Sequence, residues 1–250
     1  MGHTGTQVSD MRPDARAEMS TAGTTVKILL LTSTARRHLR FASCLSRAFH
    51  WADLHVVVEA RSPSPWPLAY DRRVWDAEQR VFDEPARIEG WVESVATAQD
   101  AFPIGEPLIA DTVIVFGSGL IRDPLLAACI ECRAVNLHAG ISPFYRGNSC
   151  NFWAAYDGHP EYVGMTIHRL SAGVDAGDIL EVVTAPDHSD PFMRGMLAVR
   201  AGQDRLIEKI RDGSIWDAGT PQDLSQTIRY SKRADFTDSV AMEFLNRSPQ

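Results

Sequence analysis

Short, mostly apolar runs of strand length, separated by helix-patterned segments, most constrain the fold of this chain. Residues 26–31 and 55–59 are two such runs, and a helical pattern covers residues 36–49 between them. Two more runs lie at residues 111–116 and 134–138. Strand–helix–strand units build parallel sheets whose strands are buried on both faces. We therefore predict an α/β fold: a Rossmann-like, mostly parallel open sheet with helices on both faces.

Later segments add to this framework. Residues 71–82 carry apolar side chains at helical spacing, and residues 90–99 indicate another helix. Two β-prone runs at residues 162–170 and 179–184 flank a Gly/Asp-rich segment, and residues 193–211 are helical in pattern. We therefore expect a C-terminal hairpin plus helix.

The domain organisation predicted from composition is simple. Residues 1–25 are polar and lack periodicity, which predicts a disordered leader. Residues 60–67 are rich in Pro and Ser and predict a loop. Residues 26–212 are expected to form one α/β domain, and residues 213–250 a short C-terminal extension.

The charge balance of the 250 residues is acidic, with a formal net charge of −7 and a pI near 5.6. Nucleic-acid binding needs a basic face that neutralises phosphates, so we expect no nucleic-acid partner. The sequence holds no run of about 18 apolar residues and lacks a signal-peptide pattern at its start. We therefore expect a cytoplasmic protein with no membrane partner.

The four cysteines, Cys44, Cys129, Cys132 and Cys150, are scattered along the chain. Cys129 and Cys132 have the spacing of half a zinc site, but no second pair completes it. We interpret these two as helix-borne core thiols and expect no metal.

Asn136 and His138 are the first candidates for chemistry. The two-residue period of a strand puts both on one face of the run at residues 134–138. An amide can donate to an oxygen that gains negative charge, and a histidine can move a proton near neutral pH. Asp175 adds a carboxylate that can orient the histidine. A structural interpretation stays open on these residues alone: a turn asparagine, a histidine bonded to a carbonyl, and a turn aspartate.

Two loops follow buried strands, where pockets form in open α/β sheets. Residues 140–148 combine Pro, Gly, an aromatic residue and Arg146. Residues 117–121 begin Gly-Ser-Gly, which allows a ligand to approach the backbone but is not a dinucleotide-binding pattern, so NAD has no support. The basic stretch at residues 229–233 is either a solvated face or a contact for a phosphate or nucleotide.

Three separated motifs occur in order: Asn136-Leu137-His138, then Pro143-Phe144-Tyr145-Arg146-Gly147, then Val174-Asp175-Ala176-Gly177-Asp178-Ile179. Over residues 26–185 this pattern resembles the catalytic domain of the 10-formyltetrahydrofolate-dependent formyltransferases. In its length and in its short C-terminal extension, the chain is most similar to the sugar N-formyltransferases of that family. The sequence departs from the family at residues 139–142 and at Val174, and both departures leave Asn136, His138 and Asp175 intact.

The resemblance implies transfer of a formyl group from 10-formyltetrahydrofolate to a primary amine of a small molecule, with a nucleotide-linked amino sugar as the leading acceptor. It implies that the catalytic residues are Asn136, His138 and Asp175. Cofactor contacts are implied at Phe116, Gly117, Ser118, Gly119, Leu120, Ile121, Gly173 and Val174. Substrate contacts are implied at Tyr145, Arg146, Gly147 and Asn148. His168 is interpreted as a structural or substrate-side residue, and a homodimer stays open.

Several alternatives remain at this point. The acceptor is alternatively another amine or a hydroxylamine in siderophore or antibiotic biosynthesis, or water. The segment after residues 26–31 lacks the Gly-rich turn of glycinamide ribonucleotide formyltransferases. The acidic balance and the short C-terminal segment disfavour tRNA. A non-catalytic folate- or nucleotide-binding module is the alternative of another class, and the intact Asn136, His138 and Asp175 argue against it.

Overall fold

The computed structural model describes residues 25–60 and 67–247. The predicted leader and most of the predicted loop at residues 60–67 therefore lie outside the described residues. Within the described ranges, no helix is both long and apolar enough to cross a membrane.

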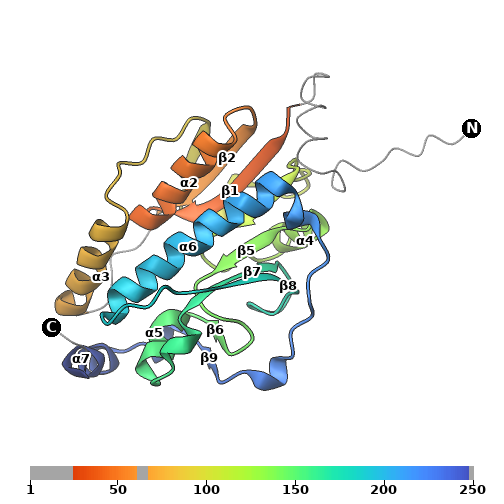
Figure 1. The fold of residues 1–250 in the computed structure, drawn as a ribbon. Helices are drawn as coiled ribbons and strands as arrows, with labels where there is room; N and C mark the ends of the chain where they lie inside the picture. Colours follow the sequence, from red (N-terminus) through yellow and green to blue (C-terminus); the bar gives the residue numbers. More distant parts are fainter. Residues whose placement is uncertain (1–24, 61–66, 248–250) are drawn as a thin grey trace, which may run out of the picture.

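A seven-stranded sheet forms the centre of the described part of the chain, in the order β3-β2-β1-β4-β5-β7-β8 (Figure 1). Its strands are β1 (Lys27–Ser33), β2 (Asp53–Glu59), β3 (Trp91–Val95), β4 (Thr112–Val115), β5 (Val135–His138), β7 (Gly164–Arg169) and β8 (Ile179–Thr184). β1 to β5 run parallel, and β7 is antiparallel to both of its neighbours. The predicted fold class is confirmed, and the carboxyl ends of β1, β4 and β5 meet at one edge of the sheet.

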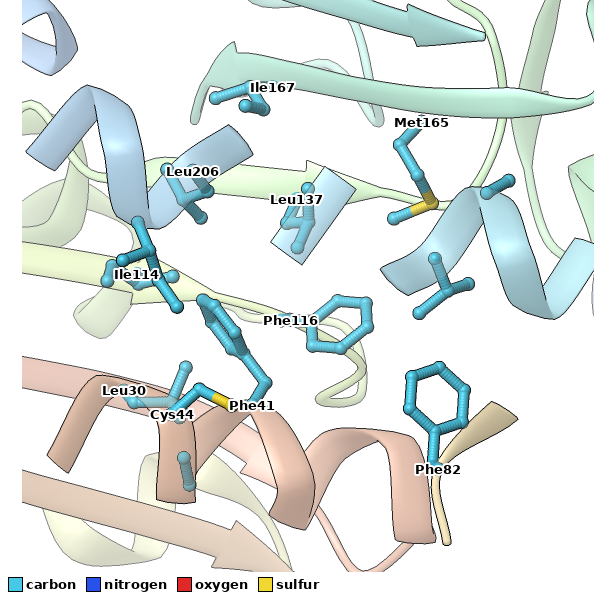
Figure 2. Close-up of a cluster of buried hydrophobic side chains, with 14 of the residues drawn as sticks. Leu30, Phe41, Cys44, Phe82, Ile114, Phe116, Leu137, Met165, Ile167 and Leu206 are labelled. Carbon is cyan, nitrogen blue, oxygen red and sulfur yellow. The ribbon is translucent and has the colours of Figure 1, made fainter. Parts of the chain in front are cut away.

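Helices cover both faces of this sheet. α2 (Arg36–Ala48), α3 (Leu68–Val81) and α6 (Pro191–Asp212) pack in the larger apolar core, and α4 (Leu125–Glu131) packs in the smaller one. Leu30 of β1 lies in the larger core, whereas its neighbours Leu29 and Leu31 lie in the smaller, as strand alternation requires. Figure 2 shows the larger core, where Phe41 of α2 and Leu206 of α6 gather over the strands.

α6 begins and ends at local sequence signals. The side chain of Asp190 accepts a hydrogen bond of 2.9 Å from the backbone N–H of Phe192, and Pro191 occupies the first helical position. Gly213 follows the helix with a φ of 82°. A capping carboxylate, an initial proline and a left-handed glycine are typical helix boundaries. The predicted C-terminal hairpin, β7 with β8, and the helix after it are confirmed.

The helix predicted at residues 90–99 is wrong. The structure has strand β3 there, followed by the short 3-10 helix η2 (Ala98–Ala101). β3 is an edge strand that pairs only with β2, and Trp91 on it is 70% exposed. Because an edge strand need not bury its apolar residues, the segment lacked a strand pattern, and the following 3-10 turn added a helix-like spacing.

Residues 213–247 are part of the hydrophobic core. β9 (Arg229–Ser231) pairs in parallel with β6 (Tyr145–Gly147), and α7 (Asp238–Arg247) lies near α5 (Cys150–Tyr156) (Figure 1). Phe236 and Phe244 pack against Phe152 of α5, with ring centroids 4.4 and 4.8 Å away. The segment predicted as a short extension therefore supports the domain that it follows.

Candidate active site

The candidate site lies at the carboxyl end of β5. Val135 and Leu137 point into the larger core, so Asn136 and His138 face the opposite side of the strand. In the antiparallel pairing with β7, Asn136 lies opposite His168. The end of one buried strand thus presents an amide and an imidazole side by side.

Asp175 joins these two side chains from the loop between β7 and β8. Its Oδ1 lies 3.3 Å from Nδ1 of His138 and accepts a hydrogen bond of 3.1 Å from Nδ2 of Asn136. Its Oδ2 accepts a hydrogen bond of 2.9 Å from the backbone N–H of Gly147. Asp175 therefore contacts both of the other predicted catalytic residues.

The backbone of Asp175 is unusual, with a φ of 48°. Non-glycine residues in the left-handed region cost of order 1–3 kcal/mol and gather at functional sites. The side chain is only 9% exposed. The hydrogen bonds to Asn136 and Gly147 hold this carboxylate in the site.

The electrostatics favour an ionised Asp175 next to His138. Burial alone would raise the pKa of Asp175, but the charge of His138 and the hydrogen bond from the backbone N–H of Gly147 hold it well below its ordinary range. Burial lowers the pKa of His138, and Asp175 opposes that shift. The carboxylate therefore stays charged at neutral pH while the ring can take up a proton.

Both nitrogens of His138 face acceptors. Nδ1 faces Asp175, and Nε2 lies 3.1 Å from the backbone carbonyl oxygen of Tyr145. A neutral imidazole has only one N–H, so it can satisfy only one of these acceptors. The protonated ring satisfies both, and this arrangement therefore assists proton uptake.

Sequence reasoning did not place His168 in the site. Its Nε2 lies 3.1 Å from Nδ2 of Asn136 and 3.5 Å from Oδ1 of Asp175. Its ring is 1% exposed. The signal that could have found it was the pairing of β5 with β7, which only a correct register reveals.

Two side chains hold the Asp175 loop from outside. Arg146 donates through Nε and Nη2 to the backbone carbonyl of Val174, at 3.2 and 2.7 Å. Gln222, which sequence reasoning missed, donates through Nε2 to the carbonyls of Asp175 and Gly177, at 3.1 and 2.6 Å. The loop geometry thus depends on a residue from the C-terminal segment.

Comparison with known proteins fits this geometry. Residues 68–187 match the model of the family described as formyl transferase. This match covers just under half of the chain. A methionyl-tRNA formyltransferase from Agathobacter rectalis is 28% identical over 135 residues, which are 52% of this chain and 43% of that relative. The chain spans less than half the length of the curated relatives it matches.

Two solved structures share the fold of this chain. A 4-N formyltransferase from Francisella tularensis has a TM-score of 0.58 and 15% identity, with 86% of each chain covered. A sugar N-formyltransferase from a Shewanella species has a TM-score of 0.58 and 15% identity, with 88% of this chain and 87% of that chain covered. At these identities the likeness establishes the fold.

The loop after β4, at residues 117–121, was expected to contact a folate. The ring of His38 lies where a Cβ on Gly117 would have to be, so this glycine makes room for a protein side chain. Glu59 at the end of β2 accepts hydrogen bonds from the backbone N–H groups of Ala98 and Gly119 and fixes the loop. Of the predicted contacts here, Leu120 is 59% exposed at the carboxyl edge of the sheet.

Three predicted contact side chains lie in the core instead. Phe116 packs against His38 and Phe41, and Ile121 is buried in the smaller core. Tyr145 is fully buried and donates its hydroxyl to Asp157. At these three positions the backbone, and not the buried side chain, is the part of the residue that can contact a ligand. Tyr145 reaches the site through its backbone carbonyl.

The remaining predicted contacts differ in exposure. Gly173 and Asn148 are exposed, and Ser118 is half-buried. In the basic stretch at residues 229–233, Arg229 makes a bidentate ion pair with Asp157 and is not free for a phosphate. Tyr230 is 50% exposed, with the guanidinium of Arg146 5.3 Å from its ring centroid.

The cysteines take no part in a metal centre that the structure describes. All four are free thiols, and Cys129 is buried in α4 with Cys132 just after it. Among residues 25–60 and 67–247, no three His, Cys, Asp or Glu side chains are grouped to hold a metal ion.

Proposed function

We propose that this chain is a formyl transferase that moves a formyl group from 10-formyltetrahydrofolate to the primary amine of a small molecule, with Asn136, His138 and Asp175 as its catalytic residues. The observation that carries the proposal is the buried contact of an amide, an imidazole and an ionised carboxylate at one strand end. These are the groups that acyl transfer to an amine requires: a donor for the oxygen and a proton acceptor for the nitrogen.

10-Formyltetrahydrofolate would supply the activated formyl carbon that the amine attacks. Asn136 would donate an amide N–H to the formyl oxygen as that oxygen gains negative charge. Both of its amide hydrogens face partners, Asp175 and His168, so one of these bonds would give way to the incoming oxygen.

His138 would accept the proton that the attacking amine releases. The ring is ready for this step because acceptors face both of its nitrogens. Asp175 would stabilise the imidazolium form through its negative charge and would fix the ring orientation. This role fits the burial of the pair, since a charge interaction is stronger where water is excluded.

The chain also has a surface that suits the folate. The loop at residues 117–121 follows β4, which lies beside β5 in the sheet, so its exposed Leu120 lies on the same edge as the catalytic residues. An exposed apolar side chain near a polar site is suited to the flat, partly apolar ring system of a pterin. Glu59 would keep this loop in place.

For the acceptor, we favour a nucleotide-linked amino sugar. Tyr230 is exposed beside Arg146, and Lys232 and Arg233 on the same segment are exposed. An exposed aromatic ring suits stacking on a base, and nearby cations suit phosphates. The fold is shared with the Shewanella structure named as a sugar N-formyltransferase. Simple amines, hydroxylamines and water remain the acceptors to compare.

The test is an acceptor panel with 10-formyltetrahydrofolate as donor and mass spectrometry as readout. We expect a formylated nucleotide-linked amino sugar, and a higher KM for that acceptor with Tyr230→Ala than with the unmodified chain. The matched control is Tyr156→Ala, an aromatic residue on α5 whose hydroxyl donates to Glu243 on α7. Folate binding without any formylated product would favour the non-catalytic module instead.

Met-tRNA is the second candidate acceptor, because curated relatives such as the Agathobacter rectalis protein carry the name methionyl-tRNA formyltransferase. The net charge of −7 argues against it, since binding of a tRNA backbone needs a basic surface. The panel therefore includes Met-tRNA.

A further inference from the structure

His168 is buried inside the site, although the proposed transfer does not use it. It lies on β7 directly opposite Asn136, with its ring 1% exposed. Its Nδ1 lies 2.8 Å from the backbone carbonyl oxygen of Arg169, and its Nε2 lies 3.1 Å from Nδ2 of Asn136. Because each nitrogen of this buried ring has a hydrogen-bond partner, the partners determine which nitrogen carries a hydrogen.

The partners fix that state from two directions. The carbonyl of Arg169 can only accept a hydrogen bond, so Nδ1 of His168 carries the hydrogen. The carboxylate of Asp175 also only accepts, so the amide of Asn136 must turn its nitrogen toward it. That same nitrogen faces Nε2 of His168, which must then be the acceptor. Both constraints give the same neutral tautomer.

The charges around Asp175 lead to the same assignment. Asp175 carries one negative charge, and two imidazole rings, His138 and His168, lie within 3.5 Å of it. Two buried cations beside one carboxylate would leave a positive charge uncompensated, which is costly. The other charged group near the pair, Arg146, adds positive charge and so opposes a second imidazolium. One ring can therefore carry the proton, and His138, whose two nitrogens both face acceptors, is the better placed.

We propose that His168 is a positioning residue whose neutral, Nδ1-protonated ring fixes the Asn136 amide with its N–H groups toward the site. His138 and His168 then divide two tasks: the first moves a proton and the second stays neutral and orients a donor. Without the acceptor at His168, Asp175 alone holds the Asn136 amide. Once the incoming formyl oxygen replaces that bond, the amide can rotate and present its own carbonyl oxygen, which would repel the reacting oxygen. The role in turnover rests on the proposed function, whereas the tautomer does not.

The tautomer is tested in the protein alone by ¹⁵N NMR of its histidine rings. We expect His168 to show a protonated Nδ1 and an unprotonated Nε2 at neutral pH. Asn136→Ala removes the donor to Nε2 and should shift the Nε2 resonance of His168. A protonated Nε2 would overturn the assignment.

Activity tests the positioning role with a matched pair of variants. Glutamine places an acceptor oxygen near the position of Nε2, whereas phenylalanine fills the space without an acceptor. We expect His168→Phe to lower kcat about tenfold to a hundredfold, the range for lost orienting partners, with little change in KM for the folate. His168→Gln should recover most of that loss. His55→Phe, a strand histidine on β2 outside the site, should leave kcat unchanged.

The outcomes separate the two proposals. Equal kcat losses in His168→Phe and His168→Gln, with both variants folded by circular dichroism, would mean that the ring acts only by filling space. If no acceptor is formylated by the unmodified chain, the proposed function fails, yet the NMR result still decides the tautomer. If His168→Phe does not fold, the kcat of His168→Gln and the ¹⁵N NMR spectra of Asn136→Ala test the proposal.

Discussion

Asp175 is the residue on which the site depends, because it binds His138, Asn136 and the Gly147 backbone with one side chain. Its left-handed backbone is a local cost that the surrounding hydrogen bonds offset. If either the buried carboxylate or the amide that it binds were removed, the other would lose one of its hydrogen-bond partners. Residue substitutions here should therefore act on chemistry more than on folate binding.

The first prediction concerns Asn136→Ala and His138→Ala. Each removes a group proposed to act on the transition state, so turnover should fall about a hundredfold to a thousandfold, as for other oxyanion donors. Affinity for the folate should change far less. Turnover numbers and folate dissociation constants measure this, and circular dichroism checks that both variants fold. Near-unchanged turnover in folded variants would make the pair structural.

The second prediction is that Asp175 acts through His138. Asp175→Asn removes the charge that raises the pKa of His138, so the acidic limb of the pH–rate profile should move to lower pH. Because the two would act as one unit, His138→Ala/Asp175→Asn should be scarcely slower than His138→Ala alone. A double mutant whose losses multiply would show instead that Asp175 acts independently of His138.

The third prediction is the pH dependence of stability. The pKa of His138 is lowered in the folded chain, so below its ordinary value of 6.5 the unfolded chain binds more protons. The free energy of unfolding should therefore fall as the pH drops below about 6.5, and the depressed pKa of Asp175 adds a further loss below about 4. Urea unfolding at pH 8, 6.5 and 5 measures the slope. In His138→Gln the slope between pH 6.5 and 5 should be smaller, and an unchanged slope would contradict the assignment.

The sequence predicts the contacts of a site residue best when the contacting residues are close together along the chain. Asn136 and His138 lie two positions apart, so the strand period alone puts them together. Asp175 needed the motif of the resembling family, because its loop follows a separate strand. His168 and Gln222 were missed, since their contacts depend on strand register and on a C-terminal segment without a pattern of its own. The burial of the Tyr145 ring was not predicted, because the short motif around it does not show which side chains enter the core.

At the scale of elements, the pairing of β6 with β9 links the C-terminal segment to the site. Gly147 of β6 binds Asp175 through its N–H and has a φ of 93°. A Cβ on Gly147 would overlap the carbonyl oxygen of Ser231 on β9. Because this position needs both a left-handed backbone and the absence of a side chain, the element pair depends on glycine.

The fourth prediction follows from that geometry. Gly147→Ala should lower the free energy of unfolding by about 2 kcal/mol or more, and should also weaken turnover because the N–H to Asp175 shifts. Gly195→Ala is the matched control: it lies inside α6 with open space around it, so it should leave turnover unchanged and stabilise by about 0.5–1 kcal/mol. Chemical denaturation and steady-state kinetics compare the two. Equal effects from both substitutions would mean that the β6–β9 contact does not support the site.

At the same scale, the sequence was reliable where periodicity was long and unreliable at the sheet edge. β1, α2 and β2 follow their predicted ranges closely because both strand faces and one helix face are apolar. β3 was predicted as a helix because an edge strand with an exposed Trp91 gives no buried pattern. Contacts with neighbouring strands, absent from the local sequence, decide such segments.

At the scale of the whole molecule, residues 213–247 contribute both to the hydrophobic core and to the candidate active site. Phe236 and Phe244 complete the aromatic cluster around Phe152, and Gln222 holds the Asp175 loop. The segment that looked like a tail therefore stabilises the core and shapes the site. The acidic balance of the whole chain adds a constraint on acceptors that no single residue reveals.

The fifth prediction is that neither uncharged initiator tRNA nor Met-tRNA is bound or formylated. A protein that neutralises several phosphates releases counterions, so real tRNA binding would weaken steeply with salt. With a net charge of −7 there is an excess of acidic groups to repel the backbone, and we expect no binding at micromolar protein in 50 mM salt. Filter binding at 50 and 200 mM salt measures this, with a nucleotide-linked amino sugar as the positive acceptor. Micromolar, salt-sensitive tRNA binding together with formylated Met-tRNA would reverse the choice of acceptor while leaving the roles of Asn136, His138 and Asp175 in place.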